Sequence, residues 1–152
     1  MDARAAHDSW PQESSPTWTK HLQGRGPEVL TEVRAWLCGL VADLAGEYRA
    51  DVILVGVELV TNAIEHGGGP RWMRLSRRDE PCLVRIEVAD SNLGQLTLGT
   101  SRFGPAAHRG NGLVIVGGVS HGWGVLRDDI RGWKTVWTTL AFGLYRRDNA
   151  GA

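Results

Sequence analysis

Residues 58 to 66 read Glu58-Leu59-Val60-Thr61-Asn62-Ala63-Ile64-Glu65-His66, and they set a line of polar side chains into an otherwise apolar helical run. At about 100° per residue, Glu58, Asn62 and Glu65 fall within roughly 60° of one another on a helix. The preceding residues are apolar on nearly every side: Val52, Ile53, Leu54, Val55, Val57, Leu59 and Val60. A helix covered on most sides belongs in a protein core. The pattern therefore predicts a central helix from about Ala50 to His66 with one polar edge.

This polar edge has two interpretations. It is either the solvated side of an amphipathic helix or part of a functional site, and helix propensity alone does not explain an asparagine there. Three later segments also carry polar residues or glycines at positions that suit a site. They are Asp90-Ser91-Asn92-Leu93-Gly94 after an alternating strand, Gly110-Asn111-Gly112-Leu113 before an apolar helix, and Gly132-Trp133-Lys134-Thr135-Val136-Trp137 in a late strand.

Composition places the chain among ordinary folded domains. It has 152 residues, 42% of them hydrophobic and 22% charged, which is enough for one domain with a genuine core. Seventeen basic residues balance seventeen acidic ones, which argues against direct binding of nucleic acid or of an anionic membrane. No apolar run is long enough to span a bilayer and no apolar signal core begins the chain, so we expect a cytoplasmic protein. Cys38 and Cys82 lack metal-ligand spacing, and we expect both to be small buried residues.

Hydrophobic periodicity predicts one α+β domain over residues 16–145, with tails at 1–15 and 146–152. Pro27 suits the first turn of a helix, which we expect to end near Gly46. The other expected elements are strands at 17–23, 71–77, 83–89, 123–127 and 133–142 and a third helix at 111–120. This succession predicts a two-layer sandwich of helices on a sheet.

Residues 91–109 form the one long irregular segment of the predicted domain, and loops of this length are commonly functional or disordered. Beyond it, Gly110 and Gly112 stand at the mouth of the third predicted helix. Glycines there expose backbone N–H groups and the positive end of the helix dipole to a phosphate chain. Glycines near a helix start are also common without any ligand. The chain contains neither a dinucleotide-binding fingerprint nor a GxxxxGK[ST] loop, so nucleotide binding would have to be of another kind.

With these four elements in this order, residues 17 to 142 resemble the GHKL, or Bergerat-fold, ATPases. Within that superfamily they are most similar to the small anti-sigma-factor serine kinases and related bacterial ATP-binding regulators. The resemblance implies a two-layer α/β sandwich with a mostly antiparallel mixed sheet and about three helices on one face. It also implies ATP and Mg²⁺ as ligands.

The resemblance assigns roles to individual residues. Asn62 would coordinate Mg²⁺ through its side-chain oxygen, a hard ligand of the kind this ion prefers. Glu58, one turn earlier, matches the general base that acts on the attacking hydroxyl. Asp90 matches the aspartate that recognises the adenine amino group, although an aspartate at a loop start also commonly caps a turn.

The remaining family positions lie in the loop and in the last strand. The usual Asp-x-Gly-x-Gly pattern has Asn92 at its first glycine and keeps Gly94. Gly110, Gly112 and Leu113 match the phosphate-binding element, and Arg109, with Arg102 and His108, would meet the terminal phosphates when the loop closes. Thr135 would support the adenine pocket as a partner of Asp90, whereas Lys134 could equally be a solvated strand residue.

The implied function is an ATP- and Mg²⁺-dependent serine/threonine protein kinase that acts as an anti-sigma factor and phosphorylates an anti-sigma-factor antagonist. Its partners would be a sigma factor and that antagonist, and relatives are often homodimers. The alternative is a non-catalytic ATP-binding module that shapes a surface for a protein partner. The ATPase module of a histidine kinase fits less well, because this chain has no dimerisation helix with a phosphoacceptor histidine.

Overall fold

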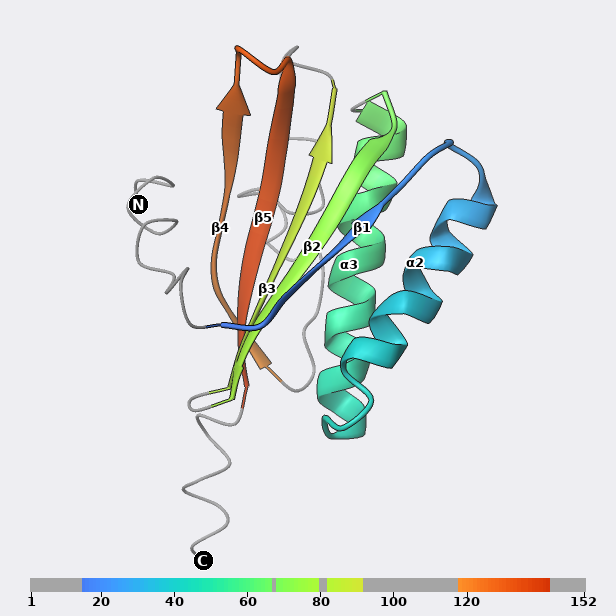
Figure 1. The fold of residues 1–152 in the computed structure, drawn as a ribbon. Coiled ribbons are helices and arrows are strands. Elements are labelled where there is room, and N and C mark those ends of the chain that lie inside the picture. The colour runs from blue at the N-terminus through green and yellow to red at the C-terminus, as the bar shows by residue number, and fades with distance from the viewer. Residues whose placement is uncertain (1–14, 67, 80–81, 92–117, 143–152) are drawn as a thin grey trace, which may run out of the picture.

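The computed structural model describes residues 15–66, 68–79, 82–91 and 118–142 (Figure 1). Within these ranges there are five strands and two helices. In chain order they are β1 (Thr17–His21), α2 (Pro27–Leu40), α3 (Gly46–His66), β2 (Pro70–Asp79), β3 (Cys82–Asp90), β4 (Gly118–Asp128) and β5 (Trp133–Phe142).

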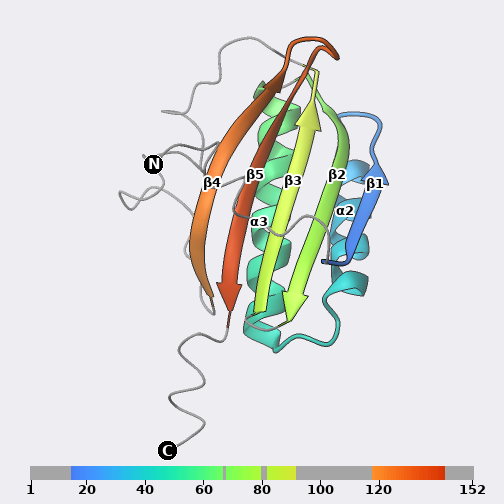
Figure 2. The same cartoon turned by 60° about the vertical axis from the view of Figure 1, so that its left-hand side comes forward.

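The strands form one sheet in the order β1-β2-β3-β5-β4, and every described neighbouring pair is antiparallel. Both helices cover the same face of this sheet, so the described residues form two layers (Figure 2). The predicted α+β sandwich is therefore confirmed. Among the described helices, none combines the length and hydropathy that a bilayer span needs.

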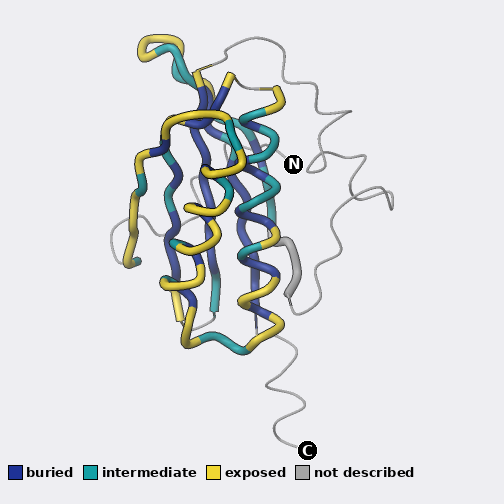
Figure 3. Tube along the Cα trace, turned by 90° about the vertical axis from the view of Figure 1, so that its right-hand side faces the viewer, coloured by how far each residue is buried: buried dark blue, intermediate teal, exposed yellow. Residues whose placement is uncertain are grey.

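Alternation along the strands decides which residues enter the core. In β3, Val84, Ile86 and Val88 are at most 1% exposed and point at the helices. They meet apolar positions at helical spacing, which are Val29, Val33 and Leu37 of α2 and Val52, Val55 and Leu59 of α3. Burial of each such side chain stabilises the fold by about 1.5–3 kcal/mol. Buried and exposed positions accordingly alternate along both helices (Figure 3).

The helix boundaries differ from the predicted ones. Helix α2 begins at Pro27 as predicted, but it ends at Leu40 and not near Gly46. The Arg77 guanidinium from β2 donates a 3.0 Å hydrogen bond to the carbonyl of Leu40, which satisfies a C-terminal carbonyl of the helix. Gly46 instead begins α3, four residues before the predicted start.

A strand replaces part of the third predicted helix. Residues 118–120 belong to β4, where Val119 pairs with Ala141 and Ser120 with Leu140. Cross-strand pairing with β5 outweighs the local helical periodicity at this point, so the prediction of helix there is wrong. The rest of that predicted helix, 111–117, lies outside the described residues.

The two helices approach closely at Gly56. A Cβ atom at this position would collide with Cδ1 of Leu37, which is fully buried. Gly56 thus lets α2 and α3 pack without a side chain between them. This contact also fixes which flank of α3 is turned toward α2.

Candidate functional site

The polar line of α3 lies on the flank that α2 does not cover. At about 100° per residue, Glu58 and Asn62 are rotated roughly 200° and 240° from Gly56, the residue that contacts α2. Both side chains are half-buried. Thr61 lies between them in sequence, but its hydroxyl donates a 2.7 Å hydrogen bond to the carbonyl of Val57 on its own helix. Glu58 and Asn62 are therefore the two half-buried polar groups of this edge that remain as candidates, while Glu65 is exposed at the end of the helix.

Asp90 ends β3 and forms a buried ion pair with Lys134 of β5. The Lys134 Nζ atom lies 3.1 Å from Asp90 Oδ1, and the two side chains are only 4% and 3% exposed. The two residues are also register partners. The next pair on the same face, Val88 and Val136, belongs to the core beneath the helices. Asp90 and Lys134 thus point to the helix-covered side of the sheet.

The C-terminal end of α3 and the ion pair lie at the same end of the molecule. Helix α3 ends at His66, and the N–H of Gly69 donates a 2.8 Å hydrogen bond to the carbonyl of Ala63. Strand β2 then begins at Pro70, the register partner of Asp90. Figure 1 shows the C-terminal end of α3, the end of β3 and the start of β5 at one end of the sandwich. Asn62 lies about one turn before the end of α3, and Glu58 one turn earlier, on the side of the sheet to which Asp90 also points.

Thr135 is not brought to this group. Its register partner is Ala89, one residue before Asp90, so its side chain lies on the opposite face of the sheet. The structure places Lys134, for which a solvated position was an open alternative, beside Asp90, where Thr135 was expected. The alternation of side chains along the strand could have predicted the position of Lys134, because Val136 is apolar and Lys134, two residues earlier, lies on the same face of the sheet.

The other predicted site residues lie outside the described part of the chain: Asn92, Gly94, Arg102, His108, Arg109, Gly110, Gly112 and Leu113. Their roles remain predictions. Within the described residues, no group of three or more His, Cys, Asp or Glu side chains could hold a metal ion. A Mg²⁺ ion bound mainly by triphosphate oxygens and waters requires no such group, and the amide oxygen of Asn62 is a suitable single protein ligand.

The two cysteines differ from expectation in part. Cys38 is exposed on α2, so the prediction that it is buried is wrong, whereas Cys82 is half-buried at the start of β3. Burial raises the pKa of the Cys82 thiol. Neither cysteine lies near Asp90, which is at the other end of β3.

Comparison with known proteins supports the fold. No family model matches the chain, and no curated protein matches it. Among solved structures, it is similar to the crystal structure of the RsbU and RsbW domains of Rv1364c from Mycobacterium tuberculosis, with a TM-score of 0.56 and 22% sequence identity. The match covers 83% of this chain and 33% of the other, so this chain spans about a third of that protein's length. At this identity the similarity shows the shared α+β fold alone, because one fold hosts many functions.

Proposed function

We propose that this chain is an ATP- and Mg²⁺-dependent serine/threonine protein kinase that acts as an anti-sigma factor and phosphorylates an anti-sigma-factor antagonist. The observation that supports the proposal is that Glu58 and Asn62, half-buried on α3, and Asp90, at the end of β3, lie on the same side of the sheet. The order of the sequence motifs supports it, and so does the fold shared with the solved structure that contains an RsbW domain.

Asp90 is the proposed determinant of base specificity. In its ion pair with Lys134 it is a carboxylate, which accepts hydrogen bonds and does not donate them. Adenine offers an amino group at its six position, whereas guanine offers a carbonyl oxygen there. A carboxylate accepts from the first and repels the second, so this site favours ATP over GTP. Lys134 compensates the buried charge and holds the carboxylate in one orientation.

Asn62 and Glu58 are the proposed phosphate-side residues. Asn62 would hold Mg²⁺, which when bound neutralises charge on the triphosphate. Glu58, one helical turn away, would accept the proton of a serine or threonine hydroxyl on the protein substrate. Because phosphoryl transfer depends mostly on positioning and charge neutralisation, one base beside one metal-binding amide is a sufficient minimum set.

Transfer of labelled phosphate from ATP to candidate antagonist proteins tests this proposal. The Glu58→Gln variant should lose transfer by about a hundredfold or more, the usual contribution of a general base, while it still binds ATP. Glu47→Gln is the matched control, because Glu47 is an exposed glutamate at the other end of the same helix and should leave transfer unchanged. Equal transfer by the wild type and Glu58→Gln would contradict the assigned role.

The second candidate function is a non-catalytic ATP-binding module that presents a surface to a protein partner. The asparagine at position 92, where the family pattern has glycine, favours it. The ion pair between Asp90 and Lys134 also favours it, because the Asp90 carboxylate would have to bind the base while it still pairs with Lys134. ATP binding without transfer to any candidate antagonist would select this function.

A further inference from the structure

A groove with a volume of about 730 Å³ lies where the start of β2 meets the end of β1 and the turn between β4 and β5. Several of its side chains come from the sheet face that the helices leave uncovered, whereas Leu22 belongs to the core. Trp72 pairs with His21 and Arg74 with Thr19, and both alternate with the core residue Met73. Trp133 lies on the same face of β5 as Thr135, two residues later. Trp72, Arg74 and Trp133 thus lie on the opposite face of the sheet from Asp90, and none of the residues that line the groove belongs to the proposed nucleotide site.

Three arginines in this groove stack on two tryptophans. The Arg74 Cζ atom lies 4.7 Å from the ring centroid of Trp72. The Cζ atoms of Arg71 and Arg131 lie 5.4 and 5.7 Å from the ring centroid of Trp133. The two indoles meet edge to face, with centroids 6.3 Å apart. Stacking of this kind occupies the aromatic faces and leaves the N–H edges of a guanidinium directed at acceptors.

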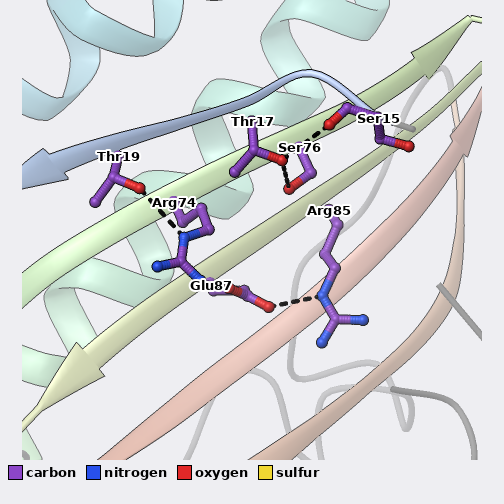
Figure 4. Close-up of polar contacts among 7 residues, drawn as sticks. All are labelled: Ser15, Thr17, Thr19, Arg74, Ser76, Arg85 and Glu87. Carbon is purple, nitrogen blue, oxygen red and sulfur yellow. Dashed lines mark hydrogen bonds and ion pairs between the residues drawn. The ribbon is translucent and has the colours of Figure 1, made fainter. Parts of the chain in front are cut away.

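The carboxylates nearest to these arginines lie at the long end of the range of ion-pair distances. Glu87 lies 3.5 Å from Arg74, but its other oxygen accepts a 2.9 Å hydrogen bond from Arg85 (Figure 4). Asp128 lies 3.6 Å from Arg131. By contrast, Arg77 on the same strand binds Asp43 through two hydrogen bonds of 2.8 and 2.9 Å. None of the described residues that line the groove is acidic. The groove therefore carries positive charge that its surroundings compensate only loosely.

We propose that this groove binds an acidic segment of a partner protein, whose carboxylates pair with Arg71, Arg74 and Arg131. Arginine forks bind carboxylates through paired hydrogen bonds, which suits several acidic side chains of one peptide. The volume falls in the range of pockets that hold ligands far larger than a single anion. Nucleic acid fits less well, because base stacking requires aromatic faces and those of Trp72 and Trp133 carry guanidinium groups. The balanced net charge of the chain also provides no broad attraction to phosphate backbones.

The test is fluorescence polarisation with a labelled peptide that carries four glutamates, compared with the same peptide carrying four glutamines. The glutamate peptide should bind and the glutamine peptide should not. Arg71→Gln and Arg74→Gln should each weaken binding by about tenfold or more, the usual loss for a charge-assisted hydrogen bond. Arg78→Gln is the matched control, because Arg78 is an exposed arginine on the same strand and the same sheet face but does not line the groove. It should change binding by less than about twofold.

Several outcomes would overturn the proposal. Equal losses in Arg78→Gln and Arg71→Gln would show a general charge effect. Equal binding of the two peptides would remove the role of carboxylates. Tighter binding of a single-stranded oligonucleotide, lost in the same groove variants, would make nucleic acid the ligand. A homodimer in sedimentation that Arg71→Gln dissociates would show that a second copy of the chain fills the groove. Because Arg71 is exposed, its variant should keep the wild-type circular dichroism spectrum, and a charge-retaining Arg71→Lys should recover part of the binding.

Discussion

Lys134 and Asp90 face each other across β5 and β3, with Nζ 3.1 Å from Oδ1 and both side chains almost fully buried. Removal of one partner leaves the other charge in a site that water scarcely reaches. Lys134→Met keeps the aliphatic stem and deletes the charge, and we expect it to lower the free energy of unfolding by about 3 kcal/mol. Urea denaturation measures this loss.

The control for this change is Arg127→Met. Arg127 is the register partner of Lys134 on β4, but its side chain is 56% exposed. Its loss should cost less than about 0.5 kcal/mol. The double variant Lys134→Met with Asp90→Asn should be more stable than the sum of the single changes predicts. Strict additivity would contradict a direct interaction between the two charges.

Gly56→Ala tests the close approach of the two helices. Alanine has the higher helix propensity, worth up to about 1 kcal/mol at an exposed position. At Gly56 the added Cβ collides with Leu37 in a fully packed core, so we expect a net destabilisation of about 1–2 kcal/mol. Gly39→Ala on α2 is the control, since a Cβ there meets nothing within 4 Å, and it should stabilise the protein. Stabilisation by both changes would disprove the packing role of Gly56.

The pairing of Asp43 with Arg77 predicts a dependence of stability on pH. Two hydrogen bonds from Arg77 hold the pKa of Asp43 below its ordinary value. The unfolded chain has the higher pKa of about 3.9, so the pair stabilises the fold fully above about pH 4 and loses this effect as the pH falls through the folded-state pKa. Asp43 is 68% exposed, so the contribution is below about 1 kcal/mol.

Thermal unfolding of the wild type and Asp43→Asn at several pH values measures this contribution. The difference in stability between the two proteins should be largest near neutral pH and should shrink as the pH falls below about 4. A difference that grows on acidification would have the wrong sign for a lowered pKa.

Local patterns predicted much of this fold. Alternation of Val84, Ile86 and Val88 with polar neighbours identified β3 and its buried face, and Pro27 marked the start of α2. The end of α2 could not be predicted in the same way, because the hydrogen bond to Leu40 comes from Arg77, which is 37 residues away in the chain. Contacts between residues far apart in the sequence decide such boundaries. They produce no hydrophobic periodicity within the segment itself.

The candidate site could likewise be predicted only in part from the sequence. Glu58 and Asn62 share an edge by helical geometry alone, so their common position followed from the sequence. The partner of Asp90 depends on the register between β3 and β5, and a shift of one residue moves every side chain to the other face. Lys134 therefore lies beside Asp90, where Thr135 was predicted, and Thr135 lies on the other face of the sheet. The arginines of the groove come from β2 and from the turn between β4 and β5, and only the folded sheet places them together.

The central claim is that one end of the helix-covered face binds ATP through Asp90 and Asn62. Thermal unfolding in buffer with Mg²⁺, with ATP and with GTP, tests it most directly, because a ligand that binds only the folded state raises its apparent stability. At a hundredfold excess over Kd, ATP should add about 2.7 kcal/mol, which corresponds to a shift in Tm of roughly 5–10 °C for a domain of this size. GTP should give a much smaller shift, and Asn62→Leu should remove most of the effect of ATP with Mg²⁺. No shift with ATP, or equal shifts with ATP and GTP, would contradict the account.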